Sequence, residues 1–257
     1  MCWSYHVKNA SQNLHSLLRV NFSPNVPKWG GNKMTLNSIY SLTIALDKGS
    51  NSISDALPKD KFTCGFVRNE PSLRFLSCQT RKYDAYADDV EIWTILSSAT
   101  FAKKYKAPQE FLPDEVVDNV TNMLLEGVER SLGLKTGSLS KDVVESRLQL
   151  WGAAVPLNVW SSKSSQSDNN DTVDGFVYDD QYGVGVCGDW LLEPSIAGAW
   201  ESGRRLAQHM ISNQQNQENG SSSMNNSIGL PSYDGKERVG GKFSVSQKTY
   251  KAGIGAL

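Results

Sequence analysis

The sequence has few cysteines and histidines, and their scarcity excludes several kinds of site. Its 257 residues include three histidines and four cysteines, Cys2, Cys64, Cys78 and Cys187. The cysteines form no C-x-x-C pair and no spacing typical of a zinc site, so we expect reduced thiols and no metal centre. None of the histidines pairs with a convincing Cys or Ser nucleophile, so the sequence indicates no catalytic residue.

Long apolar runs and an excess of one charge are also lacking. No run of about 18 apolar residues occurs, so we expect no membrane-spanning helix. The 26 basic and 27 acidic residues give a net charge of −1, which argues against nucleic acid or an anionic membrane as the main partner. The first six residues, MCWSYH, contain neither region of a signal peptide, so we expect an intracellular, cytoplasmic protein.

What the sequence does contain is a pattern of strands with one strong helix. Hydrophobic residues make up 39% of the chain, which is enough for a core, and β-branched or apolar runs predict strands at 39–46, 62–67, 73–77, 90–96 and 143–150. The Asn69-Glu-Pro71 segment predicts a hairpin turn between the second and third of these strands.

Residues 113–132 form the best helix. Val120, Leu124 and Val128 recur at helical spacing, so one face is apolar and is expected to pack on the sheet. Pro113 suits the first turn, and Gly133 suits the end.

Three segments are polar and lack periodicity, and they divide the chain. We interpret residues 1–35 as an irregular segment outside any domain, and residues 161–174 as a disordered surface insertion. Residues 213–257 are rich in Gln, Asn, Ser and Gly, which predicts a disordered tail. The folded parts are then a sheet-and-helix domain at 36–160 and a C-terminal segment at 175–212.

The most informative stretch, residues 183–204, reads GVGVCGDWLLEPSIAGAWESGR. Its first six residues spell G-x-G-x-x-G, but in a dinucleotide fingerprint the glycines follow a strand and open a helix, and an acidic residue follows about 20 positions later. Val184 and Val186 instead place the glycines inside a strand, and Gln208 stands where the acidic residue would be. The dinucleotide-fingerprint interpretation is therefore disfavoured.

The chemistry is expected after these glycines. Asp189 would stand at the carboxyl end of a strand, where ligands bind in open α/β sheets. Pro194 suits the first turn of a helix. Ser195, Ile196 and Ala197 would offer free backbone N–H groups at its positive end, which favours an anion or a partly negative oxygen. A second interpretation stays open, in which the small residues of this helix serve only close packing.

This segment resembles a known family. The runs Cys187-Gly-Asp-Trp190 and Pro194-Ser-Ile-Ala-Gly-Ala-Trp200 are similar to the C-terminal FAD-binding segment of flavin-dependent amine-oxidase-type oxidoreductases, and most similar to the renalase-like branch. The upstream order of strands and helix agrees, over roughly residues 36–211. The resemblance implies an α+β or α/β fold: a mixed-sheet substrate domain with packed helices, plus the C-terminal strand and helix of an FAD-binding Rossmann-like domain whose N-terminal half is absent.

The resemblance also implies roles for single residues. Gly188 and Asp189 would lie at the ribityl or pyrophosphate part of FAD. The backbone around Ser195, Ile196 and Ala197 would face the pyrimidine end of the flavin ring.

A further residue, Trp151, would lie on the substrate side of the ring. Taken alone, Trp151 is typical of a core aromatic residue. The family often has an Arg directly after this Trp, and this chain has Gly152 there, so the contact made by that Arg has no counterpart.

The implied function is hydride transfer from a small molecule, of the dihydronicotinamide or amine class, to FAD, with reoxidation by oxygen. The cofactor would carry the difficult chemistry. Because the pyrophosphate site would lie on the missing half, we expect this chain alone to bind FAD poorly. Two alternatives stay open: a non-enzymatic interaction module that has lost its cofactor half, or another flavin oxidase that acts on amines or on porphyrin- or carotenoid-like substrates.

Overall fold

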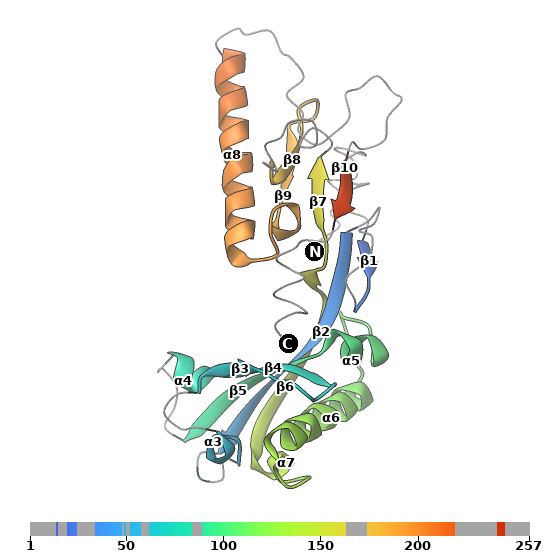
Figure 1. Cartoon of the computed structure of the whole chain (residues 1–257), viewed down its shortest axis with the longest axis vertical. Helices are drawn as coiled ribbons and strands as arrows, with labels where there is room; N and C mark the ends of the chain where they lie inside the picture. The colour runs from blue at the N-terminus through green and yellow to red at the C-terminus, as the bar shows by residue number, and fades with distance from the viewer. Residues whose placement is uncertain are drawn as a thin grey trace. The chain divides into compact units, whose positions relative to one another are not determined.

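The computed structural model describes residues 14, 20–24, 34–47, 49, 52–57, 62–83, 89–162, 174–218 and 241–244. The chain divides into two compact units, and Figure 1 labels the helices and strands of both. We call Ser38–Ala154 the sheet unit, and Met1–Asn37 together with Val155–Ala256 the helix unit.

The chain contains a mixed sheet, as predicted, and most of this sheet belongs to the sheet unit. Its strands are β2 (Met34–Asp47), β3 (Cys64–Phe66), β4 (Leu73–Cys78), β5 (Val90–Ser97) and β6 (Val143–Pro156). The pairs β2–β5, β5–β4 and β4–β3 are antiparallel, and β6 pairs with β2. At residues 34–36, β2 also pairs in parallel with β1 (Val20–Phe22), which makes the sheet mixed. The predicted hairpin is the β3–β4 pair, and Asn69 in its turn has a φ of 66°.

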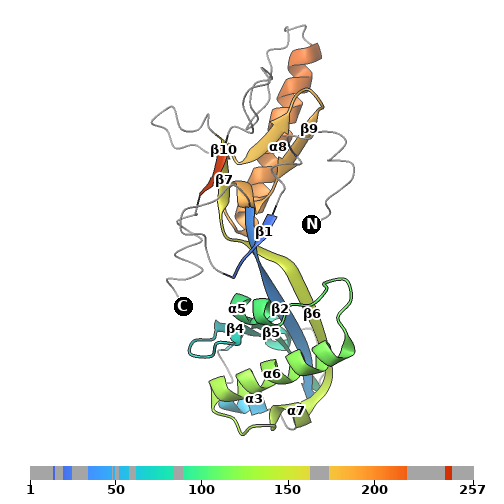
Figure 2. The same ribbon diagram turned by 90° about the vertical axis from the view of Figure 1, so that its right-hand side faces the viewer.

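The two faces of this sheet differ because side chains alternate along each strand. One face is fully buried under α3 (Ser52–Ala56), α5 (Ala99–Lys104), α6 (Asp114–Leu132) and α7 (Leu139–Asp142), and its residues include Tyr40, Leu42, Ile44, Trp93 and Ile95. Figure 2 shows α6 running across the strands. The other face, which we call the outer face, carries half-buried residues: Ser41, Thr43, Ala45, Ile92 and Thr94.

Helix α6 matches its predicted range within one residue. Pro113 caps its start in an extended conformation, and Gly133 ends it with a φ of 69° and donates its N–H to the Arg130 carbonyl. Val120, Leu124 and Val128 are buried in the core, as predicted. The helix is therefore a core element that supports the sheet.

The helix unit contains the segment that carries the family resemblance. β8 (Phe176–Asp179) and β9 (Val184–Cys187) form an antiparallel pair, followed by the 3₁₀ turn η3 (Asp189–Leu191) and by α8 (Ile196–Glu218). Leu206 of α8 is buried against Phe176 and Tyr178 of β8. Because the described strand pairs β8–β9 and β7–β10 are both antiparallel, the expected Rossmann-like arrangement is not confirmed.

Several expected irregular segments contain regular structure. Within residues 1–35, Leu14 is fully buried and Val20–Phe22 forms β1. The predicted tail begins inside α8, and β10 (Gly241–Ser244) pairs with β7 (Val159–Ser162). At these residues the structure differs from the expectation, because main-chain pairing and helical propagation need no apolar periodicity in the sequence. Residues 163–173, 219–240 and 245–257 lie outside the described residues.

A buried ionic network attaches two short helices to the sheet. Glu91 on β5 accepts hydrogen bonds from Arg81 of α4 (Gln79–Tyr83) at 2.9 Å, from Trp93 at 3.2 Å and from Cys78 at 3.3 Å, and one from Ser54 of α3. Burial raises the pKa of Glu91, but these hydrogen bonds and the Arg81 charge outweigh it, so the pKa lies below its usual range. Burial also raises the pKa of the Cys78 thiol to about 11.

We predict that Glu91→Gln lowers the free energy of unfolding at pH 7 by about 3 kcal/mol, because it leaves Arg81 without its charged partner. The deficit should shrink as the pH falls below the unfolded-state pKa, about 4.3, and through the lower folded-state pKa, since the stabilising charge of Glu91 is then lost from the wild type. Urea denaturation at pH 7 and at pH 3.5 or so measures both effects.

Glu126→Gln provides the control. Glu126 is 51% exposed and forms a 3.6 Å ion pair with Arg130, so its loss should cost about 0–1 kcal/mol. Equal losses in the two variants would contradict the proposed importance of the Glu91 network.

Candidate functional site

The glycines of the G-x-G-x-x-G run lie in and around β9. Gly183 lies in the turn before β9 with a φ of 61°, Gly185 lies within the strand, and Gly188 separates the strand from η3. The α-helix that follows begins only at Ile196. The glycines therefore do not lead directly into an α-helix, as they do in a dinucleotide fingerprint. This agrees with the sequence-based argument against that interpretation.

Asp189 begins η3, with Gly188 between it and the end of β9. Its carboxylate is half-buried and accepts a hydrogen bond from the Trp190 N–H at 3.0 Å. Burial raises the pKa of Asp189 above its usual range, although main-chain hydrogen bonds oppose the shift. Among the described residues no Lys, Arg or His forms an ion pair with Asp189. No such positive charge therefore offsets the burial, which disfavours the ionised carboxylate.

Ser195 caps the start of α8. Its hydroxyl oxygen accepts a hydrogen bond from the Gly198 N–H at 2.9 Å, which is the usual N-cap geometry. The Ser195 N–H, expected to be free, instead donates to the Glu193 carbonyl at 2.7 Å. Ile196 and Ala197 occupy the first two helical positions, whose N–H groups have no intrahelical acceptor.

This start also explains two of the neighbouring residues. Pro194 precedes the cap rather than standing in the first turn, so its role is to direct the chain into the helix. A Cβ at Gly198 would overlap the Glu193 carbonyl, so this position requires glycine. The expected close approach of the helix to another backbone is therefore present here.

Ser202 connects three segments of this region, a role that the sequence did not reveal. Its hydroxyl is fully buried, accepts a hydrogen bond from the Gly188 N–H at 2.8 Å and donates one to the Gly175 carbonyl. The sequence suggested only a small residue for close packing, because nothing in its spacing shows that a helical serine meets two loops. The bonds fix α8 against the start of β8 and the end of β9.

The first turns of α8 present an apolar patch, formed by Ile196, Ala197, Ala199 and Trp200. Ile196 is 92% exposed and Trp200 is 67% exposed. Large apolar side chains gathered in this way on a surface are typical of a binding site. The patch adjoins the N–H groups of Ile196 and Ala197.

Trp151 belongs to the sheet unit, within β6. It is 49% exposed, so it is not a core aromatic residue, and it lies on the face opposite the buried Leu150. Its neighbour Gly152 donates its N–H to Gln109 at 3.2 Å and accepts from the Ser38 hydroxyl at 3.0 Å. A side chain at position 152 would have to displace Gln109.

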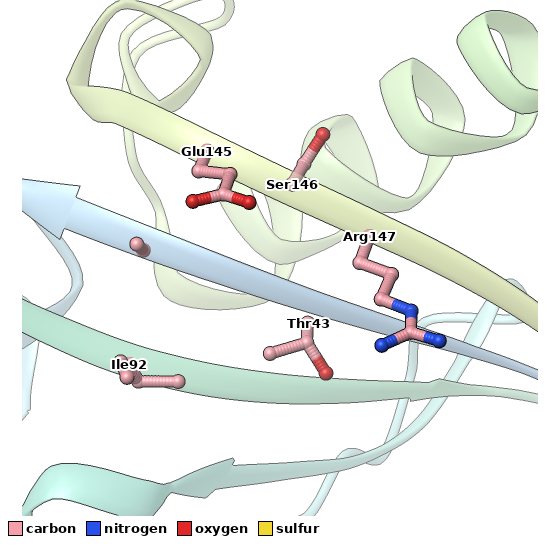
Figure 3. A pocket seen from close by; sticks show the side chains of 6 residues that line it. Thr43, Ile92, Glu145, Ser146 and Arg147 are labelled. Carbon is pink, nitrogen blue, oxygen red and sulfur yellow. The ribbon is translucent and has the colours of Figure 1, made fainter.

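The outer face of the sheet also has a depression of about 310 Å³. It is lined by residues of β2, β5 and β6: Thr43, Ala45, Ile92, Glu145, Ser146 and Arg147. Figure 3 shows the Arg147 side chain extending from β6 over the neighbouring strand and the Glu145 carboxylate at the edge of β6 on the same side, whereas Ser146 points the other way. Nothing in the sequence distinguishes these charged residues from the ordinary surface residues of a strand.

No protein-family model matches the chain, and no curated protein matches it. Among solved structures, the chain is similar to one described as "Putative protoporphyrinogen oxidase from Exiguobacterium sp. 255-15". The identity is 13% and the TM-score is 0.35, and the match covers 51% of this chain and 26% of that one. The chain therefore spans about a quarter of that protein, and a likeness at this level carries no functional argument.

In the part of the chain that the structure describes, no group of His, Cys, Asp and Glu side chains could hold a metal ion. None of the helices there combines the length and the apolar character needed to cross a bilayer.

We predict that Ser202→Ala lowers the free energy of unfolding by about 2 kcal/mol, because it leaves the Gly188 N–H and the Gly175 carbonyl without this partner. Chemical denaturation measures the loss. Ser140→Ala is the control, since the Ser140 hydroxyl forms an exposed 3.3 Å hydrogen bond and should cost little. A Ser202 variant as stable as this control would contradict the connecting role.

Asp189→Asn is expected to raise the stability at pH 7, because it removes a desolvated charge. The folded-state pKa of Asp189 is raised, so its ionisation opposes folding above the unfolded-state pKa of about 3.9. The advantage of the variant should therefore disappear as the pH falls below that value. Urea denaturation between pH 3 and pH 7 or so tests this, and a variant less stable than wild type at pH 7 would contradict it.

Proposed function

We propose that this chain supplies the C-terminal part of the FAD site of a flavin-dependent oxidoreductase. The observation that carries the proposal is the combination found at residues 188–200. A desolvated carboxylate, the N-terminus of α8 and an exposed apolar patch lie within one short segment of the helix unit. Each of these matches a different part of a flavin: hydroxyl groups, carbonyl oxygens and a planar ring.

Asp189 suits the ribityl chain better than the pyrophosphate. An ionised carboxylate only accepts hydrogen bonds, and ribityl hydroxyls can donate them. A pyrophosphate would place like charges together in a half-buried site, where their repulsion is screened less than in water. Binding to hydroxyls would also offset the desolvation of Asp189.

The start of α8 suits the carbonyl oxygens of the flavin ring. The N–H groups of Ile196 and Ala197 point out of the helix N-terminus, where the helix dipole favours a partly negative oxygen. Ser195 contributes through its cap, which holds the first turn in place, rather than through its own N–H. Gly188 gives its N–H to Ser202, so its part is to position Asp189.

The exposed patch suits the faces or edges of the ring system. Covering Ile196 and Trp200 with a planar apolar group would remove apolar surface from water.

FAD, when bound, would accept a hydride from a small molecule, and oxygen would reoxidise it. Trp151 would lie on the substrate side, the substrate being a dihydronicotinamide or an amine as in renalase-like enzymes.

We predict weak flavin binding by this chain alone, with a Kd of about 10 µM or more, since the glycine-rich βαβ unit that holds a pyrophosphate in dinucleotide-binding folds is not found among the described residues. Quenching of flavin fluorescence measures the Kd. FMN should bind about as well as FAD, and AMP should not compete, because only the flavin end is recognised. Asp189→Ala should weaken binding at least about fivefold, by loss of its hydrogen bonds.

Two outcomes would contradict the proposal. One is stoichiometric, tight FAD binding that AMP displaces, which would mean that the chain recognises the nucleotide end. The other is unchanged FMN binding in Asp189→Ala. Ser140→Ala, which alters an exposed serine far along the sequence, is a suitable control.

The exposed patch also favours one second candidate, a non-enzymatic interaction module. In that case Ile196 and Trp200 would contact another protein and no flavin would bind. The same titration separates the two: complete absence of FMN binding, together with a stable folded chain, favours the interaction module.

A further inference from the structure

The outer face of the sheet unit carries two opposite charges without partners among the described residues. Glu145 and Arg147 are exposed residues of β6, and no ion pair or hydrogen bond involving either side chain is found in the described part of the chain. Being two residues apart on a strand, they lie on the same face, with their Cα atoms about 7 Å apart. Figure 3 shows the Arg147 guanidinium over β2 and the Glu145 carboxylate at the edge of β6 that faces β2.

The floor of the depression is mostly apolar. Ala45 of β2 stands directly opposite Ile92 of β5 in the strand register, and Thr43 adds one hydroxyl group. The depression of about 310 Å³ corresponds to about ten water molecules and lies at the lower end of the range for ligand pockets, about 300–1000 Å³. The depression therefore suits a small molecule with an apolar middle.

We propose that this depression binds an ω-amino carboxylate, a short aliphatic chain with a carboxylate at one end and an ammonium group at the other. The ligand carboxylate pairs with the Arg147 guanidinium, whose planar fork matches it. The ligand ammonium pairs with Glu145, and the methylene groups lie over Ala45 and Ile92.

The Cα spacing of Glu145 and Arg147 sets the ligand length, because side chains on one face of a strand extend roughly parallel to one another. In an α-amino acid the ammonium and carboxylate are attached to the same carbon, so the molecule cannot reach both Glu145 and Arg147 fully. A chain with about four carbons between its charged groups spans the approximate 7 Å set by the strand. A ligand with only one charge leaves one side chain unpaired.

This inference goes beyond the flavin proposal and does not depend on it. All of the residues concerned lie in the sheet unit, and no redox step is involved. The binding test is made without FAD, so failure of flavin binding and failure of this site give separate results.

The experiment is isothermal titration of the full chain with 5-aminopentanoate. We expect its Kd to be at least about fivefold lower than the Kd of pentanoate, pentylamine or glycine, because only 5-aminopentanoate engages both charges at the right spacing. Equal binding of pentanoate, or no detectable binding of 5-aminopentanoate at about 50 mM, would overturn the proposal.

Charge variants test the two residues separately. Glu145→Gln and Arg147→Gln should each weaken 5-aminopentanoate binding about fivefold, whereas Glu115→Gln, at an exposed position on α6, should not. The double variant E145R/R147E should keep binding, because a flexible ligand can reverse its direction. Unchanged binding in either single variant, or lost binding in a swapped variant with the wild-type melting temperature, would overturn the assignment.

Discussion

The candidate flavin segment depends on one buried hydroxyl group. Ser202 joins the Gly175 carbonyl before β8 to the Gly188 N–H after β9, and it does so from the second turn of α8. The β8–β9 pairing and the packing of Leu206 against Phe176 and Tyr178 hold the same three segments together, and the hydroxyl adds the polar contacts between them. Because Gly188 precedes Asp189 directly, the same hydroxyl sets where that carboxylate stands. The position of the proposed ligand-binding groups therefore follows from the packing of the helix onto the strand pair.

Two features of this segment oppose stability, and both support a binding role. Burial disfavours the ionised form of Asp189, and Ile196 and Trp200 expose apolar surface to water. A sequence optimised only for folding would avoid both features. A ligand with hydroxyl groups and a planar apolar ring would remove both costs at once. The sheet unit shows the same contrast, with a tightly packed face under α6 and an outer face whose charges have no partner among the described residues.

The sequence predicted the elements that apolar patterns specify, and it missed those that depend on main-chain or single polar contacts. The β-branched and aromatic residues of β5 and the helical spacing of Val120, Leu124 and Val128 were sufficient, and Gly133 ended the helix as predicted. The pairing of β10 with β7 has no apolar signature, so the sequence gives no sign of a strand at those residues. In the candidate site, the positions of Asp189 and α8 were predictable, but the bonds of Ser195 and Ser202 were not, since they depend on where loops distant in sequence return.

The central claim is that residues 188–200 recognise the flavin end of FAD. Backbone amide NMR of the full chain during titration with FMN tests it most directly. If they do, the largest shift changes will fall on the N–H groups of Asp189, Ile196, Ala197 and Trp200, while amides of α6 stay unchanged. Shift changes confined to other segments, or none at millimolar FMN, would contradict it.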